Sequence, residues 1–105
     1  KHMKLMLICG AGMSSSLLAN KVNDAIQRRN LDIEAWAIAT TELEANLGKM
    51  DVVLLAPQVR FMLTKFKERL AGVPIEVIDF QVYGSMNGDK IVDHGIKLYE
   101  AILKK

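Results

Sequence analysis

Residues 5–18 read Leu-Met-Leu-Ile-Cys-Gly-Ala-Gly-Met-Ser-Ser-Ser-Leu-Leu. The apolar residues before Cys9 predict a buried strand, and the small residues after it predict a loop that opens into a helix. A thiol at the end of such a strand faces backbone N–H groups and the positive end of a helix dipole, which favour anions and ionised sulfur. The stretch therefore predicts a nucleophilic cysteine in an anion-binding loop of an α/β fold.

Four apolar runs alternate with helical patterns along the chain, at residues 4–8, 33–39, 51–56 and 74–79. Strands that alternate with helices are typical of βα units and a parallel sheet. The runs 4–8 and 51–56 are continuously apolar, as expected of central strands covered on both faces, whereas the run 33–39 is less uniform and suits an edge. The sequence predicts a four-stranded parallel open sheet with helices on both faces.

Four helices are predicted between and after these strands. They are a helix that begins at the serines, a short helix that begins at a capping box in residues 41–44 and ends at Gly48, a helix between Pro57 and Gly72, and a helix from about Lys90 to the C-terminus. Residues 83–89 are expected to form a loop.

The chain has 105 residues, enough for one domain with a hydrophobic core. Its formal net charge of +2 is spread along the chain, which does not favour nucleic-acid binding. The single cysteine excludes an internal disulfide, and the absence of Cys/His clusters in the sequence argues against a metal site, so we expect a cytoplasmic protein without metal or cofactor. No apolar run approaches the ~20 residues of a membrane span. We expect the domain to cover residues 3–105, with Lys1 and His2 foreign to it.

The residues after Cys9 are the candidate phosphoryl-binding group: Gly10, Ala11, Gly12, Met13, Ser14, Ser15 and Ser16. Glycines allow a sharp turn that brings backbone N–H groups close to an anion, and serine hydroxyls can cap the helix or donate to phosphate oxygens. This environment predicts that the pKa of the Cys9 thiol lies below its usual value of ~8.5.

Secondary candidates follow the third and fourth strands. Ligands of open parallel sheets bind outside the carboxyl ends of the strands, where Pro57 and Gln58 and then Asp79 and Tyr83 are expected. For Asp79 the alternative is that its carboxylate only caps a turn. His94 is interpreted as a solvated side chain of the last helix, and the alternative is that this histidine is phosphorylated.

The loop is similar to that of low-molecular-weight tyrosine phosphatases, whose signature is C-x-x-x-x-x-R followed by Ser or Thr. Ser15 stands where those enzymes have the arginine. Without a guanidinium to neutralise phosphoryl oxygens, attack on a stable phosphate ester is disfavoured. An activated phosphoryl donor such as a phosphohistidine needs only a thiolate and an anion-binding loop, because phosphoryl transfer depends on positioning and electrostatics.

Three segments together resemble the IIB component of the lactose/cellobiose family of the bacterial sugar phosphotransferase system. They are the cysteine loop at 9–18, the segment Asp-Val-Val-Leu-Leu-Ala-Pro-Gln at 51–58, and Pro-Ile-Glu-Val-Ile-Asp at 74–79 with Tyr83-Gly84. The resemblance implies a parallel sheet in strand order 2-1-3-4. It also implies that Cys9 accepts a phosphoryl group from a phosphohistidine of a IIA protein and passes it to a disaccharide entering through the membrane permease IIC.

Two other functions stay open from the residues alone. A phosphatase or arsenate-reductase-like enzyme would also use Cys9 and would turn over an aryl phosphate by itself. A noncatalytic flavodoxin-like module would bind anions in the same loop without a covalent step. The sequence does not name the sugar. Cellobiose, chitobiose, lactose and other β-glucosides are all compatible with the IIB resemblance.

Overall fold

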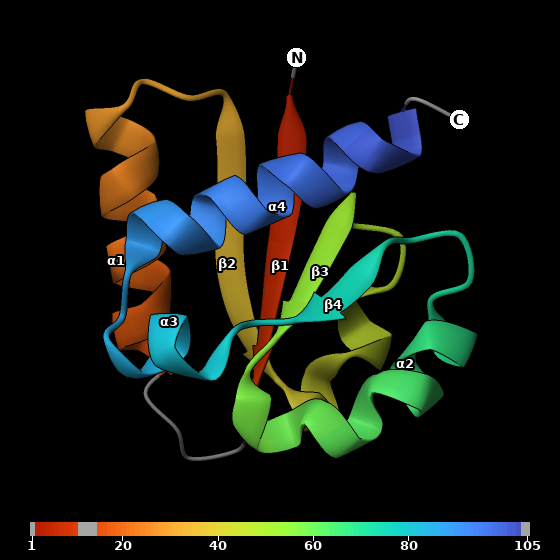
Figure 1. Ribbon diagram of the computed structural model, residues 1–105. Coiled ribbons are helices and arrows are strands. Elements are labelled where there is room, and N and C mark those ends of the chain that lie inside the picture. The colour runs from red at the N-terminus through yellow and green to blue at the C-terminus, as the bar shows by residue number, and fades with distance from the viewer. Residues whose placement is uncertain (1, 11–14, 104–105) are drawn as a thin grey trace.

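The computed structural model describes residues 2–10 and 15–103 (Figure 1). Four parallel strands form one sheet in the order β2-β1-β3-β4. Their bounds are β1 (Met3–Cys9), β2 (Ile33–Ala39), β3 (Val52–Leu55) and β4 (Ile75–Val77). The predicted sheet and its strand order are confirmed.

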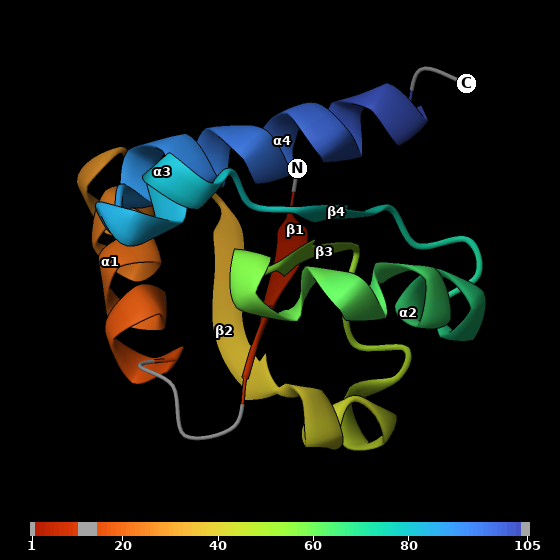
Figure 2. The same cartoon turned by 60° about the horizontal axis from the view of Figure 1, so that its bottom comes forward.

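Helices cover both faces of this sheet. The α-helices are α1 (Ser15–Arg28), α2 (Leu63–Arg69), α3 (Phe80–Gly84) and α4 (Gly88–Leu103), and the 3₁₀ segments are η1 (Thr40–Glu42), η2 (Glu44–Asn46) and η3 (Pro57–Met62). Helix α4 packs beside α1, and Figure 2 shows α4 and α2 on opposite sides of the sheet. Because all four strands are parallel, their carboxyl ends lie at the same edge of the sheet.

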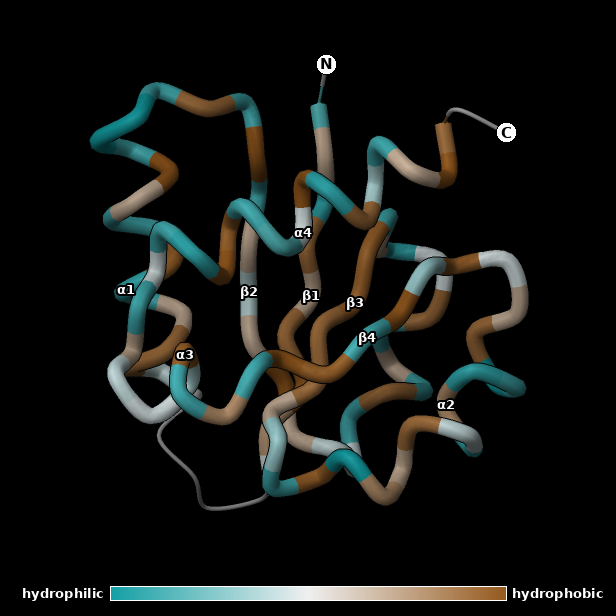
Figure 3. Tube along the Cα trace, in the orientation of Figure 1, coloured by the Kyte–Doolittle hydropathy of each residue, from teal (hydrophilic) through white to brown (hydrophobic). Residues whose placement is uncertain are grey.

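The core forms around the two central strands. Residues 5–9 of β1 and all of β3 are buried, and their apolar character is visible along both strands in Figure 3. Strand β2 is only partly covered, with Glu34 exposed and Ala35 and Ile38 buried. Burying each large apolar side chain stabilises the fold by roughly 1.5–3 kcal/mol. The continuous and interrupted apolar patterns thus correctly distinguished central from edge strands.

The prediction of a short α-helix at residues 41–48 is wrong. The segment forms η1 and η2, and Glu42, not Glu44, accepts the N–H of Ala39 at 2.7 Å. Tertiary contacts explain the difference, because Asn46 accepts the indole N–H of Trp36 at 3.2 Å and the Glu44 carboxylate accepts Nε–H of Arg69 at 2.8 Å. Asn46 and Glu44 are therefore held by side chains of neighbouring elements, and the segment does not continue as one regular helix.

The loop expected at residues 83–89 is also wrong over most of its length. Helix α3 includes Tyr83 and Gly84, and α4 begins at Gly88. Gly88 lies so close to α1 that an added Cβ would stand 2.2 Å from the carbonyl oxygen of Lys21. Glycine has low helix propensity, so a pattern based on propensity misses a glycine that packing selects.

The predicted helix between Pro57 and Gly72 is present in two parts. Segment η3 begins directly after β3 with Pro57 as its first residue, and α2 continues from Leu63. Val59 interrupts regular helical geometry with φ −114° and ψ 21°. The interruption produces a kink within η3, between β3 and α2.

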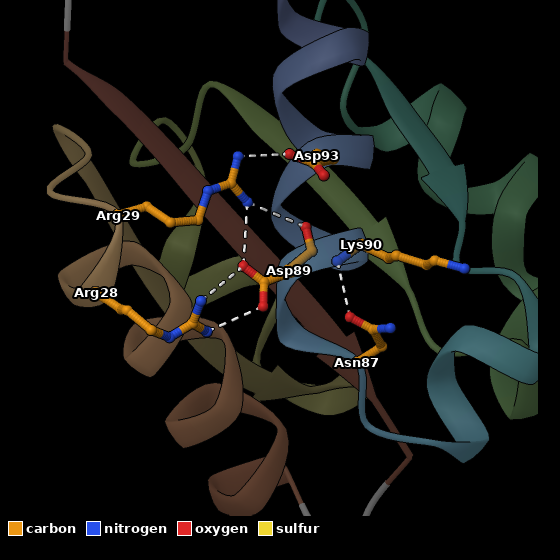
Figure 4. Close-up of polar contacts among 6 residues, drawn as sticks. All are labelled: Arg28, Arg29, Asn87, Asp89, Lys90 and Asp93. Atoms are coloured by element: carbon orange, nitrogen blue, oxygen red, sulfur yellow. Dashed lines mark hydrogen bonds and ion pairs between the residues drawn. The ribbon is translucent and has the colours of Figure 1, made fainter.

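Two arginines at the end of α1 bind acidic residues at the start of α4 (Figure 4). Arg28 Nη2 lies 2.9 Å from Asp89 Oδ2, and Arg29 Nη2 lies 2.8 Å from Asp93 Oδ1. The hydrogen bond from Arg28 is the main reason that the pKa of Asp89 is lowered from its ordinary value. These contacts join the two helices on one face of the sheet.

Replacing Asp89 with asparagine should lower thermal stability at pH 7 by about 1–3 °C, because exposed ion pairs contribute little. The folded-state pKa of Asp89 is lowered, so its contribution exists above the unfolded value of ~3.9 and disappears as pH falls through the folded value. The difference in Tm between parent and Asp89→Asn should therefore shrink as pH falls below ~3.9 and vanish below the folded-state pKa of Asp89. Glu100→Gln, on the same helix, is the control. A difference that persists unchanged in acid would contradict the ionic origin.

Candidate active site

Cys9 is the last residue of β1, at the edge of the sheet where the strands end. It pairs in register with Ala39 of β2, and on the other side Ala56 donates its N–H to the carbonyl of Ile8 at 2.9 Å. The Cys9 side chain is fully buried, with 0% of its surface exposed. Cys9 therefore lies at the carboxyl edge of the sheet, between the end of β2 and the segment that follows β3.

Helix α1 begins at the same edge, six positions after Cys9 (Figure 1). It is 14 residues long and has no acidic residue in its first turn, so no carboxylate there opposes the positive end of its dipole. Of the candidate phosphoryl-binding residues, Gly10 is half-buried and Ser16 is exposed in the first turn of α1. Ala11, Gly12, Met13 and Ser14 lie outside the described residues, as does the side chain of Ser15.

Tyr83 of α3 is the described side chain that bears on the Cys9 thiol. Burial raises the pKa of Cys9, and the neighbouring Tyr83 hydroxyl acts in the opposite direction with a smaller effect. Burial, followed by the proximity of Cys9, likewise raises the pKa of Tyr83. Yet the Tyr83 hydroxyl makes no hydrogen bond of regular geometry within the described part of the chain, so the two groups are neighbours but not a formed pair.

The expected lowering of the Cys9 pKa is not supplied by the described residues. Their net effect is to raise the pKa of the thiol, because the sulfur is enclosed by apolar side chains. The prediction depended on backbone N–H groups of the loop, most of which falls outside the described residues. Within the described part of the chain, Cys9 is therefore a buried thiol whose pKa is raised by burial and lowered to a smaller extent by Tyr83.

The secondary candidates surround the same edge in different environments. Pro57 is buried at the start of η3, and Gln58 beside it is exposed. The Asp79 carboxylate accepts the N–H groups of Gln81 and Val82 at 3.0 and 3.2 Å, so it caps α3. Capping stabilises the first turn of α3 and agrees with the simpler of the two interpretations of Asp79.

Two exposed aromatic residues near this edge were missed by sequence reasoning. Phe61 is 78% exposed and Phe80 is 69% exposed, and both line a shallow hollow with Pro57, Gln58 and Arg60. Their apolar character in the sequence is no different from that of core residues such as Phe66. The available signal was their position in the segments that follow two strands, since Phe80 comes directly after Asp79 and Phe61 comes four positions after Pro57.

His94 lies on α4 and is not brought to this site. Its Nε2 lies 2.7 Å from Glu76 Oε1, and the histidine side chain is 27% exposed. It is therefore half-buried and paired, where the sequence suggested a solvated side chain. Within residues 2–10 and 15–103, no group of three or more His, Cys, Asp or Glu side chains is arranged to hold a metal ion, and no helix is long and apolar enough to cross a membrane.

Comparison with known families gives a match over residues 4–94 to the family described as PTS system, Lactose/Cellobiose specific IIB subunit. The chain belongs to this IIB family. The predicted resemblance is confirmed, and the IIB fold explains why Cys9, α1 and the segments after β3 and β4 converge at one edge. Members of this family act as phosphotransferases in sugar phosphorylation, so this chain is a sugar-specific phosphotransferase component and the phosphatase alternative is not favoured.

Similar IIB proteins carry different sugar names. The chain is 42% identical over 95 residues to the galactose-specific EIIB component of Lactococcus lactis subsp. cremoris, covering 84% of this chain and 88% of that protein. It is 31% identical over 97 residues to the oligo-beta-mannoside-specific EIIB component of Bacillus subtilis, covering 90% and 94%. Among solved structures, the cellobiose-specific IIB component of Borrelia burgdorferi superimposes with a TM-score of 0.80 at 38% identity, covering 96% and 94%.

Proposed function

We propose that Cys9 of this IIB component accepts a phosphoryl group from a phosphohistidine of a IIA protein and passes it to a disaccharide delivered by a IIC permease. The observation that carries the proposal is the position of the only cysteine in the chain, at the end of a central strand with a helix beginning six residues later. Helix N-termini favour anions, and a cysteine thiolate is a good nucleophile. The proposed phosphoryl-binding groups are the N–H groups and hydroxyls of residues 10–16.

The transfer from the donor is balanced without an added base if the thiol is already ionised. The Cys9 thiolate supplies the electron pair of the new S–P bond. The N–P bond of a phosphoimidazolium breaks, and its electron pair returns to a neutral imidazole. Because the donor is preactivated, the protein contributes mainly positioning and a positive potential for the phosphoryl oxygens. No metal or cofactor is required for this step.

The same residues favour storage of the phosphoryl group over its hydrolysis. Ser15 replaces the arginine of the phosphatase signature, so one source of transition-state stabilisation is missing. Asp79 already binds two backbone N–H groups, which makes it unsuited to activate a water molecule. The phosphorylated protein should therefore persist for minutes without an acceptor, and decay within seconds would count against the proposal.

A direct transfer assay tests this function. The protein is incubated with labelled phosphoenolpyruvate, the general phosphotransferase components and a IIA protein, and peptide mapping then locates the label. The expected result is label on Cys9. Label that fails to appear on Cys9 would overturn the proposal, and turnover of an aryl phosphate by the isolated protein would favour the phosphatase alternative.

The hollow at Phe61 and Phe80 is the proposed contact for the IIA donor in the cytoplasm. Any protein that delivers a phosphoryl group to Cys9 must cover the edge at which β1, β3 and β4 end, and both phenylalanines project from segments that follow β3 and β4. Exposed aromatic residues are frequent sites of strong contact in protein interfaces. The IIA protein would then contact these rings while its phosphohistidine reaches Cys9.

Replacing Phe61 or Phe80 with alanine should raise the KM for the phosphorylated IIA donor about tenfold and leave kcat nearly unchanged, since the rings bind without touching the reacting atoms. The measurement is the rate of label transfer at varied donor concentration. Leu103→Ala is a matched control, because Leu103 is 48% exposed at the C-terminal end of α4. An equal rise in KM for the Leu103 variant would remove the argument for this surface.

A further inference from the structure

The Tyr83 hydroxyl is a buried polar group without a regular hydrogen-bond partner. Tyr83 is 5% exposed, and within the described residues its hydroxyl is the one buried side-chain N or O atom that lacks such a partner. Leaving a buried hydroxyl unpaired destabilises a folded protein, and a phenylalanine would fill the same space without that cost. The position therefore has a polar group that packing alone does not require.

Helix α3 holds this hydroxyl in place. The N–H of Tyr83 donates to the carbonyl of Asp79 at 2.9 Å, and the Asp79 carboxylate caps the first turn. Ser85 Oγ, at the other end of α3, donates to the carbonyl of Gln81 at 2.9 Å. A helix of only five residues is thus fixed at both ends. It holds the Tyr83 hydroxyl where that group and the fully buried Cys9 thiol affect each other's pKa.

We propose that the Tyr83 hydroxyl is a catalytic hydrogen-bond donor to the Cys9 sulfur that engages when the sulfur carries negative charge. A neutral thiol is a weak acceptor, which agrees with the lack of a regular partner for this hydroxyl among residues 2–10 and 15–103. A thiolate is a strong acceptor, and hydrogen bonds to ionised groups are shorter and roughly twice as strong as neutral ones. The inference deepens the proposed function and rests on Cys9 being the phosphoryl carrier.

The Tyr83 hydroxyl stabilises the thiolate both when the phosphoryl group arrives at Cys9 and when it leaves. The thiolate is the nucleophile when the phosphoryl group arrives, and it is the leaving group when the S–P bond breaks and the electron pair stays on sulfur. Tyr83 keeps its proton throughout, because burial and the nearby Cys9 raise the pKa of its hydroxyl. Among the described titratable groups, Tyr83 is the one that alters the pKa of Cys9, and the nearby Asp79 carboxylate is committed to the backbone of α3.

Titration of the single cysteine tests the donor directly. Cysteine labelled with ¹³C at Cβ gives one resonance in this chain, and its shift follows ionisation of Cys9 in the isolated protein. Tyr83→Phe should move the titration midpoint up by about one pH unit, a tenfold loss of thiolate at pH 7. Tyr99→Phe is the matched control and should leave the midpoint unchanged, because Tyr99 lies beside Met3 and Leu31, near the start of β1.

A stability measurement separates the catalytic role from a structural one. Tyr83→Phe should retain or slightly raise the Tm of the unphosphorylated protein, since no regular hydrogen bond of the described structure is lost. An unchanged Cys9 midpoint, or a Tm lowered by several degrees, would overturn the proposal. The titration needs no phosphoryl donor, so its result is independent of the transfer assay. If the midpoint shifts but the protein accepts no phosphoryl group, the hydrogen bond from Tyr83 to Cys9 is supported and only the proposed function is rejected.

Discussion

Replacing Cys9 with serine should lower the rate of phosphoryl acceptance by a factor on the order of 10³ or more. A serine hydroxyl is essentially un-ionised at neutral pH, whereas a thiol can supply a useful fraction of thiolate. Serine could replace the thiol only if a general base removed its proton. Among the described side chains, Tyr83 is the one that affects the pKa of Cys9. Its hydroxyl carries a proton at neutral pH and therefore does not act as a general base.

The measurement is incorporation of label from the IIA donor under single-turnover conditions. Cys9 is fully buried, so the serine hydroxyl is expected to destabilise the fold by roughly 1–3 kcal/mol, which leaves a folded protein at room temperature. Thermal unfolding of Cys9→Ser and of Cys9→Ala checks that both variants fold. Transfer to the serine variant at the parental rate would instead favour a noncatalytic anion-binding module.

His94→Gln provides the matched control for the identity of the carrier residue. His94, on α4, is the only histidine in the sequence after β1. Its ring is paired with Glu76 of β4. If Cys9 carries the phosphoryl group, the His94 variant should accept label at the parental rate. Loss of label in His94→Gln with retention in Cys9→Ser would assign the group to the histidine.

The sequence predicted those parts of the fold that depend on long apolar patterns. Strand β2 was predicted with its observed bounds, and β1, β3 and β4 differ from prediction by one or two residues at their ends. The two central strands are recognisable because a parallel strand buried on both faces is almost continuously apolar, whereas β2 and β4 lie at the edges of the sheet and each contain an exposed glutamate. The position of Cys9 followed from the same pattern, since a thiol that ends such a run must lie at the carboxyl edge of the sheet.

The features that were missed depend on tertiary contacts. Helix α3 has five residues, too few to show helical periodicity, and it is stabilised by the Asp79 cap. Tyr83 was expected at the same edge of the sheet as Cys9, but within a loop, and the structure instead places it on α3. Phe61 and Phe80 are exposed, and whether an apolar residue is exposed depends on how its short helical segment is oriented.

The second large expected effect concerns Gly88, at the contact between α1 and α4. An ideal Cβ at this position would lie 2.2 Å from the carbonyl oxygen and 2.7 Å from the carbonyl carbon of Lys21. Both atoms belong to the backbone of α1 and cannot move without displacing that helix. The neighbouring side chains of Val22, Ile91 and Val92 are fully buried, so separating the helices would also disrupt packing in the core.

Gly88→Ala should therefore reduce the free energy of unfolding by about 2–4 kcal/mol, measured by urea denaturation. Gly84→Ala is the matched control, because an added Cβ there meets nothing within 4 Å, and alanine is favourable in a helix. Gly95→Ala should lie between them, since its Cβ would contact the flexible side chain of Leu5 at 3.2 Å. Equal stability of the Gly88 and Gly84 variants would show that α1 and α4 can separate without cost. Because α1 begins at the cysteine loop, the destabilised Gly88 variant should also transfer phosphoryl groups more slowly, while Gly84→Ala should not.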